Sequence, residues 1–168
     1  LHPDVEKYKL IERTHYLPEI PKNYLARLFN VVYLFVKNFS QAPLVLLRSL
    51  NIFKYGKRAA CLRLFYSTLP FLDAPKYDII HCQFGRQAIC KFGPYSYEGL
   101  VLREIGAVEG KLLTTFRGYD ISWYLHKYGE NVYNGLFEEA DFFYTNCEFF
   151  RQRVIEVGCG VEKIVVHG

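Results

Sequence analysis

The second half of the chain alternates short apolar runs with helical patterns, and this alternation limits the possible folds more than any other feature. The apolar, strand-like runs occupy residues 77–82, 111–116, 141–145 and 164–166. Helical patterns follow the first three runs, at residues 97–106, 132–140 and 148–157. Near-continuous apolar strands that alternate with helices are typical of a parallel sheet covered on both faces. The sequence therefore predicts an α/β fold, in one domain of a size that 168 residues allow.

Ligands of parallel α/β sheets bind beyond the carboxyl ends of the strands, so the residues that follow each run are candidate site residues. The first run leads through His81 into Gln83, Gly85 and Arg86. Imidazole and amide groups offer neutral hydrogen bonds and glycine permits close backbone approach, which suits a hydroxyl-rich or phosphate ligand. A buried histidine bonded to a neighbouring carbonyl is an equally good interpretation of His81.

The second run leads into Arg117, Gly118, Tyr119 and Asp120. The planar guanidinium of arginine matches phosphate or carboxylate. Asp120 could orient Arg117, accept hydrogen bonds from sugar hydroxyls, or only cap the following turn. Glu148 follows the third run at the start of a helix, where the helix dipole alone explains a carboxylate.

Residues 20–72 hold eight cations and no Asp or Glu, although the net charge of the chain is only +4. Such a block implies an anionic partner, unless it is only a solvated helix face. Nucleic acid fits poorly because the block is apolar and has no RNA-binding signature. A lipid surface fits better.

Three helices are expected in this first half, at residues 23–39, about 40–50, and after Gly56, whereas residues 1–22 read as a loop. The first helix does not qualify as a membrane span, because Arg27, Asn30 and Lys37 interrupt the run of about 20 apolar residues that a span needs. It is expected to pack on a core or to lie on a membrane.

Several chemistries lack their sequence signatures. The chain has no dinucleotide or phosphate-binding glycine motif, no nucleophile elbow and no paired catalytic carboxylates. Its five cysteines form no Cys-x-x-Cys pair and are interpreted as reduced thiols of a cytoplasmic protein, with no metal and no cofactor. Because the chain lacks Met and a leader pattern, we expect it to be a segment of a longer protein.

Four segments, in order, resemble the N-terminal domains of glycosyltransferase family 4, in the branch that builds bacterial exopolysaccharides such as colanic acid. They are residues 77–85 (YDIIHCQFG), 114–122 (TTFRGYDIS), 136–153 (LFEEAD followed by NCEFFRQR) and 158–168 (GCGVEKIVVHG). The resemblance implies a GT-B fold, in which this chain is the Rossmann-like acceptor side and a missing C-terminal domain binds most of the nucleotide-sugar donor. It implies a retaining hexosyltransferase that needs no metal.

The resemblance also assigns the site. Arg117 and Asp120 are the expected catalytic residues, and the expected substrate-binding residues are His81, Gln83, Gly85, Arg86, Gly118, Tyr119 and Glu148. The family's usual histidine is replaced by Arg117, which could stabilise the charge that develops on a leaving nucleotide diphosphate. The usual serine before Glu148 is Cys147.

A lipid-linked acceptor at an anionic membrane would explain the basic block. The cations expected to face it are Lys54, Lys57, Arg58 and Arg63, with neighbouring apolar side chains in the membrane interface. The protein is then peripheral at the inner face of the cell membrane. Two alternatives remain: a non-catalytic module that docks on membranes or partner enzymes, and a Rossmann dehydrogenase or epimerase, against which the missing glycine motif counts.

Overall fold

The computed structural model describes residues 2–12, 14, 16–83 and 95–167. In it the chain divides into two compact units, Leu1–Ala74 and Pro75–Gly168. Each unit has a hydrophobic core of its own. The boundary between the units coincides with the point where the sequence changes from the basic helical block to alternating strands and helices.

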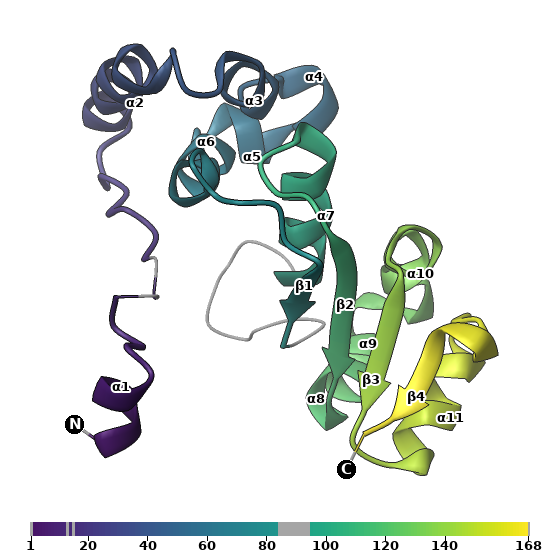
Figure 1. Ribbon diagram of the computed structural model, residues 1–168. Helices are drawn as coiled ribbons and strands as arrows, with labels where there is room; N and C mark the ends of the chain where they lie inside the picture. The colour runs from purple at the N-terminus through teal and green to yellow at the C-terminus, as the bar shows by residue number, and fades with distance from the viewer. Residues whose placement is uncertain (1, 13, 15, 84–94, 168) are drawn as a thin grey trace. The chain divides into compact units, whose positions relative to one another are not determined.

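The first unit is helical (Figure 1). Its elements are α1 (Pro3–Lys7), α2 (Tyr24–Asn38), α3 (Pro43–Ser49), α4 (Ile52–Tyr55), α5 (Lys57–Ala60), α6 (Arg63–Thr68) and the 3-10 turn η1 (Leu69–Phe71). The Asn23 side chain accepts a hydrogen bond from the Leu25 N–H at 2.8 Å, which begins α2 where the sequence predicts a helix.

Local structure in this unit differs from the sequence prediction in three places. Residues 52–55 form the short helix α4, where no helix is predicted. Residues 3–7 form α1 instead of loop, with Pro3 in its first turn and the His2 imidazole accepting a hydrogen bond from the Asp4 N–H. The single helix expected after Gly56 is two helices, α5 and α6, because Leu62 between them has a left-handed backbone with φ of 62°. The buried side chain of Leu62, which is 8% exposed, holds this break against the core.

The apolar side of α6 is buried in the core of the first unit. Phe65 and Tyr66 are fully buried and pack with Val31 of α2 and Leu46 of α3. Leu62, which precedes α6, completes the cluster. These side chains are therefore not available to a membrane interface, which corrects the expectation drawn from the sequence for the apolar residues beside the basic cluster.

One of the eight cations of the basic block is a structural residue. Arg27 is only 9% exposed, and its guanidinium donates to the carbonyls of Pro21 and Cys61, both at 2.9 Å. A buried guanidinium is tolerated only when its donors are satisfied. Arg27 therefore fastens α2 to the segment before it and to the turn before α6.

The second unit contains the predicted parallel sheet, with strand order β1-β2-β3-β4. The strands are β1 (Ile79–Cys82), β2 (Lys111–Phe116), β3 (Phe142–Thr145) and β4 (Ile164–Val166). The elements between them are α7 (Tyr95–Ile105), α8 (Gly118–Ile121), α9 (Trp123–Tyr128), η2 (Glu130–Tyr133), α10 (Asn134–Glu139), α11 (Glu148–Glu156) and η3 (Val161–Lys163). The α/β fold class is confirmed; the short helices α8 and α9 were not predicted.

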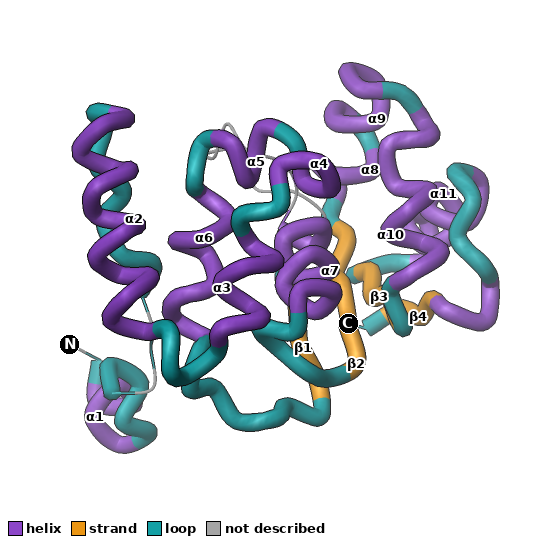
Figure 2. The backbone as a smooth tube through the Cα atoms, turned by 90° about the horizontal axis from the view of Figure 1, so that it is seen from above, coloured by secondary structure: helices purple, strands orange, loops and turns teal. Residues whose placement is uncertain are grey.

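In the described part of this unit the helices cover one face of the sheet. Figure 2 shows α7 to α11 on the same side of the four strands. Burial alternates accordingly, since Leu112, Thr114 and Phe116 are buried while Leu113 and Thr115 are half-buried. The expectation of helices on both faces is wrong here. Each strand is added beside the previous one in the same direction, and right-handed connections that all step one way stay on one face.

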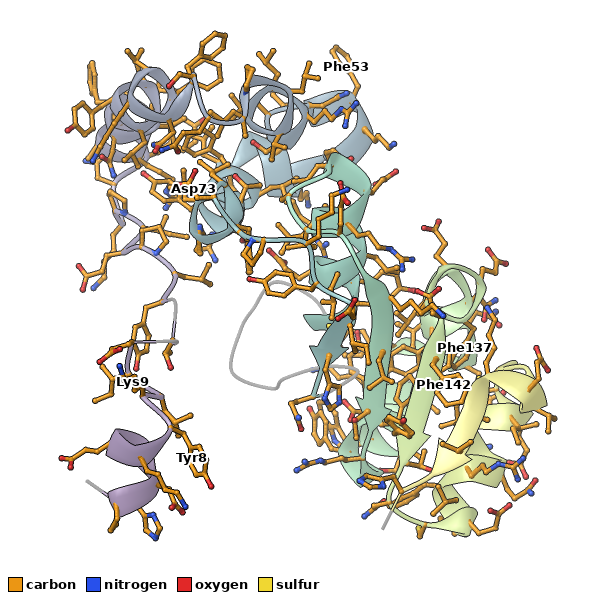
Figure 3. The ribbon with its side chains drawn as sticks, viewed as in Figure 1. Tyr8, Lys9, Phe53, Asp73, Phe137 and Phe142 are labelled. Atoms are coloured by element: carbon orange, nitrogen blue, oxygen red, sulfur yellow. The ribbon has the colours of Figure 1, made fainter. Side chains whose placement is uncertain are left out.

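An aromatic cluster fills the space between the sheet and its helices. The Phe116 ring lies 4.9 Å from that of Tyr133, and Phe137 of α10 meets Phe143 of β3 edge-on at 5.4 Å. All four side chains are buried. Phe142, the neighbour of Phe143, lies on the strand and is only half-buried (Figure 3). The core therefore fixes the face of β2 and β3 that points to the helices.

Candidate functional site

The carboxyl ends of β1 and β2 lie next to each other, with Cys82 paired to Thr114. His81 and Thr115 lie on the half-open face of the sheet, one residue away from this pair on each strand. The His81 Nε2 is 2.8 Å from the Thr115 Oγ1. The two strand ends are therefore joined by side chains as well as by the backbone ladder.

A chain of hydrogen bonds continues from this pair to Arg117. The Gln83 Nε2 is 3.4 Å from the His81 Nδ1, and the Arg117 Nη2 donates to the Gln83 Oε1 at 3.4 Å. Because the amide oxygen of Gln83 accepts from Arg117, its amide nitrogen faces His81 as a donor. The Nδ1 of His81 is then the acceptor, and its Nε2–H donates to Thr115.

These hydrogen bonds bring together three of the residues that the sequence predicts for the site. His81, Gln83 and Arg117 are all exposed. The alternative interpretation of His81 as a buried residue bonded to a carbonyl is wrong, because the side chain is exposed and meets a hydroxyl. The arrangement offers a guanidinium and an amide side by side, which can bind phosphate, carboxylate or hydroxyl groups.

Asp120 lies beneath Arg117 and is almost fully buried, at 1% exposure. Its Oδ2 accepts a hydrogen bond from the Arg117 N–H at 3.0 Å, and its own N–H donates to the Arg117 carbonyl at 2.9 Å. The Tyr133 hydroxyl donates to the Asp120 carbonyl at 3.1 Å. Among the three roles considered for Asp120, these contacts describe the cap of α8, which holds the backbone of Arg117 in place.

Gly118 is needed for packing behind this cap. A Cβ at this position would lie 2.9 Å from the Cζ of Phe150 on α11. A larger residue would force the Phe150 ring or α8 to shift. The glycine is thus a packing requirement of the site, and ligand contact is not needed to explain it.

Tyr119 forms an aromatic pair that sequence reasoning missed. Its ring stacks on Trp123, with the ring centroids 5.2 Å apart, and both side chains remain exposed. The Lys127 Nζ lies 4.8 Å from the centre of the Trp123 ring. The spacing of Tyr119, Trp123 and Lys127 at intervals of four residues was a signal available in the sequence, but recognising it required knowing that residues 118–128 are helical.

Glu148 stands at the start of α11 and bonds within its own helix. Its Oε1 accepts from the Arg151 Nη1 at 2.8 Å and from the Gln152 Nε2 at 2.9 Å. The hydrogen bond from Gln152, and then that from Arg151, hold the pKa of Glu148 below its usual value. These contacts favour the structural interpretation of Glu148 as a first-turn carboxylate.

The remaining predicted site residues divide into two groups. Gly85 and Arg86 lie within residues 84–94, outside the part of the chain that the structure describes. Lys54 and Lys57 are exposed, whereas Arg58 and Arg63 are half-buried.

Among the described residues, no group of three or more His, Cys, Asp or Glu could hold a metal ion. A hollow of about 340 Å³ lies near the amino ends of β2 and β3, lined by Ile79, Lys111, Leu112, Leu113, Asp141, Phe142 and Tyr144. The residues that line the hollow do not include His81, Gln83 or Arg117.

The parallel sheet and the side chains at the carboxyl ends of its strands together define a class: α/β proteins that present polar and cationic side chains beyond the ends of parallel strands. The chain is 29% identical over 167 residues to the "Putative colanic acid biosynthesis glycosyltransferase WcaL" of Salmonella typhimurium. It is 28% identical, over the same length, to the protein of that name in Escherichia coli strain K12. Each match takes in 98% of this chain but 38% of the relative, so the chain spans well under half the length of these relatives.

Two other comparisons gave nothing. No protein-family model matches the chain. No solved structure matches it either. The similarity to a glycosyltransferase named for colanic acid biosynthesis agrees with the resemblance drawn from the four sequence segments.

Proposed function

We propose that the chain is the acceptor-side part of a retaining glycosyltransferase of family 4 and GT-B fold. The enzyme moves a hexose from a nucleotide sugar to a lipid-linked or saccharide acceptor in bacterial exopolysaccharide synthesis. The match to the N-terminal 38% of two glycosyltransferases supports this division of labour, with a following domain that binds most of the donor.

The observation that carries the proposal is the hydrogen-bonded chain that ends in Arg117. The Arg117 guanidinium is held by Gln83 at 3.4 Å, and its backbone is held by the cap on Asp120. Departure of a nucleotide diphosphate develops negative charge, and a preorganised guanidinium stabilises such charge better than a mobile one. His81 and Gln83 then serve sugar hydroxyls or phosphate oxygens beside it.

The test is the activity of the full-length polypeptide that carries this chain. Arg117→Ala is expected to lower kcat by about 100-fold, by analogy with the loss of one transition-state donor. Release of the nucleotide diphosphate from a panel of nucleotide sugars, with lipid-linked and free saccharide acceptors, is the measurement. Arg117→Lys keeps the charge and loses the fork, so it should recover part of the loss. Wild-type kinetics in Arg117→Ala would leave Arg117 with a structural role alone.

The second candidate function is a non-catalytic module that docks on membranes or partner enzymes. The large apolar side chains that the first unit exposes favour it. An anionic membrane surface is proposed as a partner under either function, because residues 20–72 hold cations and no carboxylate. Among the described residues, no helix is long and apolar enough to cross a membrane. Sugar transfer by the full-length polypeptide separates the two functions.

A further inference from the structure

The outer face of α2 is apolar and exposed, although the opposite face of the helix already packs on a core. Leu25, Phe29, Val32 and Val36 recur every three or four positions, which places them on one side of the helix. They are 63%, 76%, 55% and 71% exposed. We call the exposed apolar residues of this side the α2 stripe: Leu25, Leu28, Phe29, Val32, Tyr33, Val36 and Phe39.

The helices that follow α2 in the first unit add further exposed apolar side chains. Leu44 and Leu47 of α3 and Ile52 of α4 are each more than half exposed. Phe53 is fully exposed and points away from α4 (Figure 3). Large apolar side chains concentrated in this way mark an interaction surface, because leaving them in water forfeits their burial.

The charges around the stripe identify the kind of partner. Lys22 and Lys37 stand at the two ends of α2 and are exposed, as are Arg48, Lys54 and Lys57. Residues 20–72 contain no Asp or Glu, so this part of the sequence is purely cationic in its charged side chains. Cations beside an apolar stripe match a lipid interface, where anionic headgroups lie directly above hydrocarbon. Tyr33 adds an aromatic ring with a polar end, which suits the same boundary.

The length of α2 decides its orientation. Its 15 residues extend about 22 Å, which is shorter than the roughly 30 Å of a bilayer's hydrocarbon core. We infer that α2 lies flat in the surface of an anionic bilayer, with the α2 stripe in the hydrocarbon boundary and the lysines at the headgroups. This inference rests on the anionic membrane proposed above as a partner, and it names the element that enters it.

A fluorescent reporter tests the inference directly. Trp123 is the single tryptophan, so Trp123→Phe removes the background. In that chain, Phe29→Trp places the reporter on the stripe, and Phe149→Trp is the matched control, since Phe149 is 74% exposed on α11 of the other unit. With phosphatidylcholine–phosphatidylglycerol vesicles, emission at position 29 should shift to shorter wavelength and be quenched by brominated lipid. Emission at position 149 should do neither.

Binding measurements complete the test. The double variant Phe29→Ser, Val36→Ser should bind the same vesicles at least about tenfold more weakly, because it loses two apolar side chains that the bilayer would bury. Phe149→Ser should bind like wild type. Raised salt, or Gln at Lys54, Lys57, Arg58 and Arg63, should weaken binding by removing its Coulombic part. Circular dichroism shows whether each variant keeps its helices.

Several results would overturn the inference. Vesicle binding without a shift at position 29 would mean that binding is Coulombic alone, and equal binding to neutral vesicles would remove the anionic partner. Self-association of the lipid-free chain that Phe29→Ser abolishes would assign the stripe to a second copy. Absence of vesicle binding would also refute it. None of these readouts uses sugar transfer, so a failure of the glycosyltransferase proposal remains distinguishable.

Discussion

Arg117 takes part in two separate sets of contacts at the carboxyl edge of the sheet. Its guanidinium reaches Gln83, while its backbone N–H is bound by the buried carboxylate of Asp120. In the family pattern that residues 114–122 resemble, histidine stands at this position. An arginine stays charged at every physiological pH, whereas a histidine does not. We therefore expect Arg117 to stabilise charge, as in the proposed function, and not to transfer a proton.

Asp120 provides a prediction at the scale of a single residue. Asp120→Ala removes the acceptor of the Arg117 N–H, and should lower the free energy of unfolding by about 1–3 kcal/mol. Asp120→Asn keeps an acceptor oxygen and should be nearly as stable as wild type. Urea unfolding of both variants is the measurement. If Asp120 is also catalytic, Asp120→Asn will lose turnover in the full-length polypeptide despite its stability. Equal stability of Asp120→Ala and wild type would rule out the cap.

Two cysteines of the second unit, Cys82 and Cys159, are poor candidates for a reactive thiol. Burial raises the pKa of Cys82 to about 11, and it is also the main cause that raises the pKa of Cys159 to about 11. A thiol with such a pKa is protonated at neutral pH and is a weak nucleophile. This agrees with the interpretation of these cysteines as reduced thiols.

At the scale of elements, the contact between α8 and α11 can be tested with two glycines. Gly118→Ala should destabilise the protein by about 1–3 kcal/mol, because the new Cβ would overlap the Phe150 ring. Gly135→Ala is the control. Its Cβ would meet only the Tyr97 ring and hydroxyl, at 3.7 Å or more, and alanine favours the helix α10, so stability should be unchanged or raised by up to about 1 kcal/mol. Thermal unfolding that is equally unaffected in both variants would contradict the packing argument.

Asp141 joins α7 to β2 and gives a pH prediction. Burial opposes its charge, but hydrogen bonds from the Leu112 N–H and the Arg103 guanidinium outweigh this and lower its pKa. The carboxylate is bound more favourably in the folded state, so its stabilisation is present above the ordinary value of about 3.9 and is lost as the pH falls through the folded value. Asp141→Asn should therefore be less stable than wild type near pH 7, and this difference should shrink toward about pH 3.

Urea unfolding across that pH range is the measurement for Asp141. A difference between wild type and Asp141→Asn that stays constant over the range would contradict the lowered pKa of Asp141, because the folded state would then not favour the charged carboxylate. Both groups are partly exposed, so raised salt should also reduce the difference.

At the scale of the whole molecule, the 168 residues by themselves should not transfer sugar. Catalysis needs donor and acceptor positioned together, and the chain matches 38% of the glycosyltransferases it resembles. Nucleotide release from the nucleotide-sugar panel should equal the uncatalysed rate. Joining the chain to the C-terminal remainder of the Salmonella relative offers a gain-of-function arm. Transfer by the chain alone would refute the two-domain proposal.

The sequence by itself determined the α/β class, the parallel strands and the end of the sheet that carries His81, Gln83 and Arg117. These follow from local patterns, since apolar runs fix strands and the polarity of the chain fixes which end each loop leaves. The change of charge and pattern near Pro75 was also visible in the sequence, which was nevertheless interpreted as one domain; the division into two compact units comes from the structure.

Only the tertiary structure decided which apolar residues are buried. The stripes of α2 and α6 look alike in the sequence, yet Phe65 is buried and Phe29 is exposed. Likewise, the placement of the described helices on one face of the sheet depends on how the connections step from strand to strand. The Tyr119–Trp123 pair depends on short helices that have no strong periodicity in the sequence. Burial is a property of what packs against a side chain, and the residues that pack against Phe65 come from α2 and α3, far away in the sequence.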